Sequence, residues 1–232
     1  MSEAPKTWLE RMKEKAKTPK AAYTFGFAAI ICIVCSLVVS SAATLLKQRQ
    51  DRNVRIDQQK NILGAVGLSA ETPEAIEALY AKRIEKLSVT DAKLDLYVRS
   101  DDGQPAAYAF PIKGKGLWST LYGFLALEPD GDTIKGISFY KHGETPGLGA
   151  EIEKEWFKNN FVGKKCIADD GSLASITLVK GKVKDVIAPL LQKHFVDGIS
   201  GATVTSRGVT ALLRSGLEQY APFFKTLQKE KR

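Results

Sequence analysis

The sequence contains few of the residues that build disulfides, metal centres and common catalytic sites. It has three cysteines and two histidines in 232 residues, so it predicts no disulfide framework and offers little for a metal site or a Ser-His-Asp triad. It has no P-loop, and Ile152 stands where a Rossmann fingerprint beginning at Gly147 would need its third glycine. We therefore expect no metal site and no direct binding of NADH.

Composition excludes several further classes of protein. The mean hydropathy is −0.15 and 44% of the residues are hydrophobic, which excludes an intrinsically disordered chain and a polytopic membrane protein. The net charge of +8 is compatible with nucleic-acid binding, but no run of basic residues interleaved with aromatic ones follows the N-terminal arm. We therefore expect no nucleic-acid partner.

One segment differs sharply from the average. Residues 23–46 contain no charged side chain, and most of them are apolar. A helix of that length is about 36 Å long and can cross a hydrocarbon core of about 30 Å. A cleaved signal peptide is the alternative, because Ser41-Ala42-Ala43 resembles a cleavage site, but the apolar stretch is longer than the apolar region of about 7–15 residues in a typical signal peptide. We expect one uncleaved transmembrane helix at 23–46 and a basic arm at 1–22 that contacts anionic membrane lipid.

Charges on both sides of this segment bear on its orientation. Six cations precede the expected span and five follow it closely, which favours a cytoplasmic N-terminus by a small margin. No second span follows, so we expect the folded domain to lie outside the cytoplasm. Within the span, Cys32 and Cys35 are either small apolar residues facing lipid or a neighbouring helix, or part of a redox or metal site.

The remaining residues predict two helices followed by an α+β domain. Residues 47–90 are expected to form a helical stalk or packing layer, with a helix at 51–66 and another that opens at Thr72-Pro73 and continues through Ile84 and Leu87. Residues 91–232 are expected to form a domain with a largely antiparallel sheet and flanking helices. Its expected strands are 93–99, 106–111, 121–127, 133–139 and 175–179, with a hairpin turn at 128–132 and helices at 150–159 and 206–224.

Two segments, 142–150 and 197–206, are dense in glycine and small polar residues. The second runs into an expected amphipathic helix, so unpaired N–H groups and the positive end of the helix dipole meet at Thr203 to Ser206. Such a helix start stabilises an anion by about 0.3–1 kcal/mol per charge. From the residues alone, a Ser/Thr cap after a tight turn is the simpler alternative.

The sequence Asp-Gly-Ile-Ser-Gly-Ala-Thr at 197–203 resembles the flavinylation motif of bacterial FMN-binding domains. The resemblance implies that FMN is attached through its phosphate, as a phosphoester, to the hydroxyl of Thr203. A dedicated flavin transferase would move it there from FAD, and Asp197 would serve recognition by that enzyme. Thr205 is the nearest alternative attachment residue, and Ser200 is the next.

Two further segments, 111–119 and 143–149, resemble the C subunits of the Na+-translocating NADH:quinone oxidoreductases (NQR), as does the order of arm, span and flavin domain. The G subunit of the RNF-type ferredoxin:NAD complexes shares the Ser-Gly-Ala-Thr and Glu-Thr-Pro-Gly features. It usually lacks the Gly-Lys-Gly-Leu-Trp sequence, so it is the less favoured alternative. A membrane-anchored sensor or assembly module whose loops bind no cofactor is a third hypothesis.

The NQR resemblance implies an electron-relay subunit of a bacterial inner-membrane complex, with no catalytic residue of its own. Other subunits of the NQR complex would oxidise NADH, reduce ubiquinone and export Na+. The FMN of this chain would pass electrons between other redox centres on the periplasmic side, and the protein would position and tune the flavin.

The resemblance also suggests which residues contact the flavin. We expect the loop from Glu144 to Gly149 to meet the ring, with Leu148 on its face and Thr145 and backbone amides at its polar edge; a purely structural turn is the alternative. Trp118 either stacks on the flavin or fills the core, and Lys113 and Lys115 are expected in solvent. The expected cofactor-binding residues are Trp118, Glu144, Thr145, Gly147, Leu148, Ser200, Gly201, Ala202 and Thr203.

Overall fold

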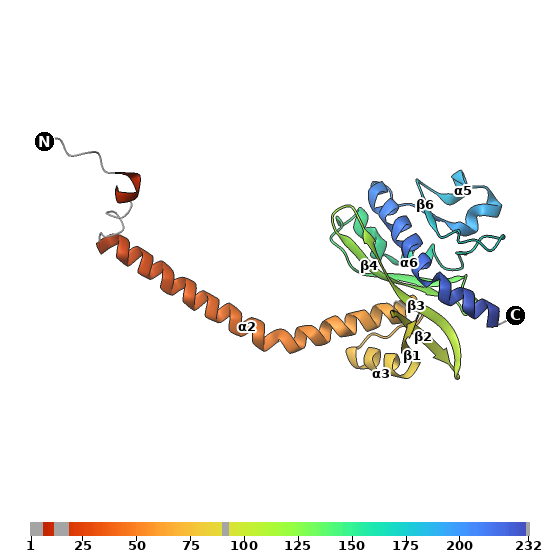
Figure 1. Ribbon diagram of the computed structural model, residues 1–232, viewed down its shortest axis with the longest axis horizontal. Coiled ribbons are helices and arrows are strands. Elements are labelled where there is room, and N and C mark those ends of the chain that lie inside the picture. Colours follow the sequence, from red (N-terminus) through yellow and green to blue (C-terminus); the bar gives the residue numbers. More distant parts are fainter. Residues whose placement is uncertain (1–6, 12–18, 90–92, 231–232) are drawn as a thin grey trace. The chain divides into compact units, whose positions relative to one another are not determined.

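The computed structural model describes residues 7–11, 19–89 and 93–230 (Figure 1). The chain divides after Asn53 into two compact units, which are described separately below. Most of the basic arm predicted for residues 1–22 lies outside the described residues.

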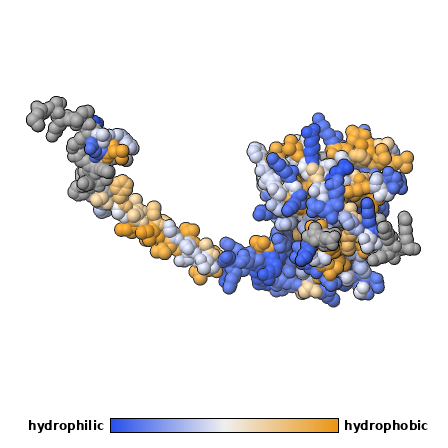
Figure 2. Space-filling view, in the orientation of Figure 1, coloured by the Kyte–Doolittle hydropathy of each residue, from blue (hydrophilic) through white to orange (hydrophobic). Residues whose placement is uncertain are grey.

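The first unit contains most of one long helix, α2 (Pro19–Ala65). It is long and apolar enough to cross a membrane from Ala22 onward. Every described side chain from Ala22 to Asn53 is exposed, and Figure 2 shows a hydrophobic stretch of this helix giving way to a hydrophilic one. The uncharged segment predicted to span the membrane therefore lies within one uninterrupted helix.

The second unit is built on an antiparallel meander of five strands that pair in chain order. Its largely antiparallel sheet confirms the predicted α+β class. The strands are β1 (Ile84–Val89), β2 (Leu94–Asp101), β3 (Gln104–Lys115), β4 (Thr120–Leu127) and β5 (Ile134–Lys141). A second sheet pairs two short parallel strands, β6 (Thr177–Val179) and β7 (Phe195–Asp197).

Side chains alternate between the two faces of the meander, and each face buries an apolar cluster. On one face Phe110 of β3 stacks on Tyr220 of α6 (Thr203–Glu230), with ring centroids 4.4 Å apart. On the other face Ala107 and Ala109 pack against the end of α2 and against α3 (Pro73–Arg83). Helices therefore cover both faces, and the N-terminal end of α6 lies beside the sheet.

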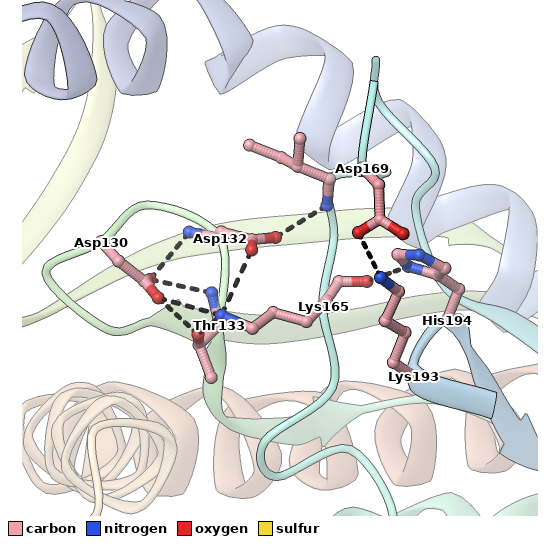
Figure 3. A network of polar contacts seen from close by, with 8 residues as sticks. Asp130, Asp132, Thr133, Lys165, Asp169, Lys193 and His194 are labelled. Carbon is pink, nitrogen blue, oxygen red and sulfur yellow. Dashed lines mark hydrogen bonds and ion pairs between the residues drawn. The ribbon is translucent and has the colours of Figure 1, made fainter. Parts of the chain in front are cut away.

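A polar network joins the β4–β5 turn to residues 165–169 and to Lys193 and His194, which come just before β7 (Figure 3). Lys165 lies 3.3 Å from both Asp130 and Asp132 of the turn. The backbone N–H of Ile167 donates to Asp132 over 2.7 Å, and His194 Nδ1 lies 2.6 Å from the Lys165 carbonyl oxygen. These contacts link the β4–β5 turn, through Lys165, to His194, which directly precedes β7 (Phe195–Asp197).

The structure corrects one prediction about the helical layer at 47–90. The helix that opens at Thr72 and Pro73 ends at Arg83, and Ile84 has extended backbone angles of −117° and 122°. Residues 84–89 form the edge strand β1, paired along its length with β2. The prediction that the helix continues through Ile84 and Leu87 is therefore wrong.

Other predicted elements exist with different bounds. The expected helix at 150–159 is divided into a 3₁₀ helix η1 (Gly149–Glu153) and a short α4 (Glu155–Asn159). The break falls at Lys154, whose backbone is extended, with φ −73° and ψ 144°. The strand predicted at 175–179 is confirmed as the shorter β6, and the hairpin around 128–132 is confirmed. Two short helices, α5 (Val183–Val186) and η2 (Pro189–His194), connect β6 to β7.

Candidate functional site

The glycine-rich segment after β7 is a tight turn that leads directly into α6. The Ala202 N–H donates to the Ile199 carbonyl over 3.1 Å, and the Ser206 N–H donates to the Ala202 carbonyl over 3.0 Å. The buried Ser206 hydroxyl also accepts from the Ile199 N–H over 3.2 Å. The helix therefore begins at Thr203, three residues before the predicted start, because Ser206 bonds back to the turn.

The hydroxyl-bearing residues of this segment have different environments. Thr203 and Ser200 are exposed, whereas Thr205 is fully buried. The Thr205 hydroxyl donates to Glu144 Oε2 over 2.5 Å. Of the two threonines, only Thr203 presents its side chain to an incoming group.

Glu144 lies beneath this surface and is only 5% exposed. Its Oε2 accepts from Thr205 and from the Leu117 N–H at 3.2 Å, and its Oε1 accepts from the Trp118 N–H at 3.0 Å. Burial by itself raises the pKa of the Glu144 carboxyl, but these hydrogen bonds outweigh it and lower the pKa. The carboxylate thus joins all three motifs that the sequence singles out.

Two glycines allow this close packing. A Cβ at Gly149 would lie 2.7 Å from both Glu144 Oε2 and Thr205 Oγ1. Gly201 has a φ of +75°, and a Cβ there would lie 2.8 Å from Leu148 Cδ2. The loop at 143–149 therefore packs directly against the turn that precedes Thr203.

Four large apolar residues on the segments that Glu144 joins are exposed: Leu117 (46% exposed), Trp118 (72%), Leu148 (42%) and Val204 (49%). We call these four residues the apolar bed. Trp118 does not fill the core, so that alternative is wrong. An exposed group of apolar side chains of this kind is typical of a binding surface.

A cavity of about 620 Å³ opens beside Thr203. Trp156 lines it together with three cationic residues, Lys180, Lys182 and Arg207. None of the described residues that line it is acidic. Trp156, Lys180, Lys182 and Arg207 were not among the predicted site residues. The one available signal was the position of Arg207, four residues after Thr203 on the same helix.

The first turn of α6 adds backbone donors to the site. Within the part of the chain that the structure describes, the N–H groups of Thr203, Val204 and Thr205 have no backbone or side-chain acceptor. These groups carry the positive end of the dipole of a 28-residue helix. The arrangement can bind a phosphate next to the Thr203 hydroxyl and the face of a flat ring on the apolar bed. FMN contains both groups, joined by a ribityl chain.

The other predicted site residues lie close by. Thr145 and Gly147 are exposed in the loop at 143–149, and the Thr145 carbonyl accepts from the Leu148 N–H over 3.1 Å. Gly201 is exposed and Ala202 is buried beneath the turn. Lys113 and Lys115 are exposed, as expected.

Asp197 contacts residues that lie before α5 and at its start. Its Oδ1 accepts from the Val183 N–H over 2.7 Å, and Lys182 Nζ lies 3.1 Å from its Oδ2. Burial raises the pKa of Asp197, but the Val183 amide and Lys182 outweigh that effect and lower it. These contacts close the loop between α5 and β7, and recognition by a transferase stays a prediction.

None of the three cysteines forms a disulfide. Cys166 is buried and unpaired, and burial raises the pKa of its thiol. Cys32 and Cys35 are exposed on α2. Among the described residues, no group of three or more His, Cys, Asp or Glu side chains could hold a metal ion.

Known proteins resemble this chain along most of its length. The family described as FMN-binding domain matches residues 116–218. The C subunit of the Na+-translocating NADH-quinone reductase of Yersinia pestis is 35% identical, over 86% of this chain and 90% of that protein. The corresponding protein of Haemophilus ducreyi is 36% identical, over 80% and 85%. The crystal structure of the C subunit from Parabacteroides distasonis superposes with a TM-score of 0.68 at 32% identity, covering 77% of this chain and 96% of that one.

Proposed function

Because the chain belongs to the family of C subunits of the Na+-translocating NADH-quinone reductases, we propose that it carries FMN as a phosphoester on Thr203 and relays electrons. The observation that carries this proposal is the contrast between two threonines. Thr203 is exposed at the first turn of α6, whereas Thr205 is fully buried and donates to Glu144.

Attachment of the cofactor would be a phosphoryl-group transfer from FAD. A bond forms between Thr203 Oγ1 and the phosphorus on the flavin side, the phosphoanhydride bond of FAD breaks, and AMP leaves. The hydroxyl proton passes to a base of the flavin transferase. The exposed side chain of Thr203 and the N–H groups of the first helical turn favour this position.

The bound flavin supplies the redox chemistry, and the chain supplies its position. The apolar bed offers a surface for the ring, with Leu148 held against Gly201 and Trp118 held by its amide on Glu144. Thr145 and Gly147 lie exposed in the neighbouring loop, where they can meet the polar edge of the ring. Because these residues are exposed, a redox partner can approach closely. Glu144 would support the flavin contacts from beneath.

The proposal extends to the place of the chain in the cell. α2 would anchor it in the bacterial inner membrane, with the N-terminal arm on anionic lipid and the flavin domain in the periplasm. The other subunits of the complex would oxidise NADH, reduce ubiquinone and export Na+. The curated relatives are named as quinone reductase subunits, which favours this assignment over an RNF-type relay and over a sensor without a cofactor.

Denaturing gel electrophoresis under ultraviolet light tests the proposal. The full chain co-produced with a flavin transferase should give a fluorescent band that survives boiling in detergent. Thr203→Ala should abolish the band. The matched variant Thr226→Ala, which replaces an exposed threonine near the end of α6, should retain it. A dark wild-type band, or fluorescence that persists in Thr203→Ala, would contradict the proposed attachment.

A further inference from the structure

We propose that the cavity beside Thr203 binds the phosphoryl group of the attached flavin, and that Arg207 and Lys180 are its cationic contacts. The inference rests on the proposed attachment of FMN at Thr203. It assigns a binding role to two residues that lie outside the flavinylation motif.

Helix geometry brings Arg207 to the attachment point. Thr203 and Arg207 are separated by four residues on α6, so they lie on the same side of the helix one turn apart. Both line the cavity of about 620 Å³. A guanidinium group has a planar set of donors that matches two phosphate oxygens at once.

The charge of the cavity favours an anion. Lys180 and Lys182 come from the turn after β6, and together with Arg207 they give three cations with no acidic residue among the described lining. Lys182 already pairs with Asp197. Within the described part of the chain, neither Arg207 nor Lys180 has an ion-pair partner, so both are free to pair with a ligand.

The ligand has matching chemistry. A flavin joined to threonine through its phosphate is a phosphodiester, with one negative charge shared by two non-bridging oxygens. The N–H groups of Thr203, Val204 and Thr205 lie at the same end of α6 as the attachment residue and have no acceptor among the described residues, so they can provide additional donors. The volume falls within the range of about 300–1,000 Å³ that is usual for small-molecule sites, so it can hold the phosphoryl group with part of the ribityl chain.

The test compares three variants of the full chain co-produced with a flavin transferase and purified in detergent: Arg207→Gln, Lys180→Gln and Arg214→Gln. Arg214 is the matched control, because it lies on the same helix with an exposed side chain paired to Glu218. In-gel fluorescence reports attachment. The ³¹P NMR shift of the phosphodiester and the fluorescence anisotropy of the flavin report whether the phosphoryl group is held.

We expect Arg207→Gln to keep its flavin while its ³¹P resonance moves towards that of the flavin-peptide released by proteolysis and its anisotropy falls. Lys180→Gln should show the same changes to a smaller extent, and Arg214→Gln should match the wild type. A ³¹P resonance and anisotropy in Arg207→Gln that equal those of the wild type would overturn this inference alone. A wild-type chain without covalent flavin would overturn the proposed function as well.

Discussion

The buried carboxylate of Glu144 accepts a hydrogen bond from the hydroxyl of Thr205, 61 residues away in the sequence, over 2.5 Å. Thr205 lies two residues after the proposed attachment point, and the same carboxylate accepts from the amides of Leu117 and Trp118. Glu144 therefore ties the start of α6 to the loop that carries part of the apolar bed. It explains why a threonine so close to Thr203 is itself inaccessible.

Substitution of Glu144 should destabilise the domain in proportion to the donors that it leaves without an acceptor. Three donors converge on the carboxylate, and a glutamine has only one acceptor oxygen. We expect Glu144→Gln to lower the free energy of unfolding by about 1–3 kcal/mol and Glu144→Ala by more. Denaturant unfolding followed by circular dichroism measures the change.

A double-mutant cycle with Thr205→Val isolates the bond between the two side chains. Glu155→Gln is the matched control, because the Glu155 side chain is 77% exposed, and it should change stability by less than about 0.5 kcal/mol. If Glu144→Gln were as stable as Glu155→Gln, the carboxylate would not hold the site together.

The stability of the domain should fall in acid partly through Glu144. Its pKa is lowered in the folded chain relative to its usual value of 4.5, so its contribution is fully present above about pH 4.5 and is lost as the pH falls through the folded value. The midpoint temperature of thermal unfolding should therefore fall less steeply between pH 6 and pH 3 in Glu144→Gln than in the wild type. Equal slopes in the two proteins would argue against an ionised Glu144.

Substitution of Trp118 should affect the flavin without affecting the fold. Its side chain is 72% exposed, so Trp118→Ala should change the free energy of unfolding by no more than about 0.5 kcal/mol. Removal of an aromatic ring from the flavin surface should raise flavin fluorescence. Trp8, equally exposed in the N-terminal arm, provides the control, and an identical emission from Trp118→Ala and Trp8→Ala would remove Trp118 from the flavin site.

The sequence was most informative where local signals decide the structure. The Pro129-Asp130-Gly131 turn predicted the β4–β5 hairpin, because Gly131 adopts a positive φ of 69° there. Ile84 and Leu87 misled the helix prediction because their spacing fits one helical turn. In the structure they lie on an edge strand, whose stability comes from pairing with Leu96 and Arg99.

The interior of the candidate site could not be predicted in the same way. The motif at 197–203 indicated Thr203, but the partners of Glu144 come from distant segments that only the folded sheet brings together. An isolated tryptophan is compatible with either the core or a binding surface, so the sequence did not decide between them, and the structure shows that Trp118 is exposed. Arg207 is an ordinary helix residue by sequence and became notable only as part of the cavity wall.

The orientation of the chain can be read with a fused reporter. A periplasm-active enzyme joined after Arg232 should be active, because α2 is expected to cross the membrane once and to leave the domain outside the cytoplasm. The same fusion with a cytoplasm-active reporter serves as the control and should be silent. The reverse pattern would place the domain in the cytoplasm.

The central claim is that FMN is joined to this chain at one threonine. Mass spectrometry of the proteolytic peptide that contains Ser200, Thr203 and Thr205 measures this directly, with fragmentation to locate the modified residue. We predict a mass increase equal to FMN less one water, located at Thr203. An unmodified peptide from the fully matured chain, or a modification at Thr205 or Ser200, would contradict this claim.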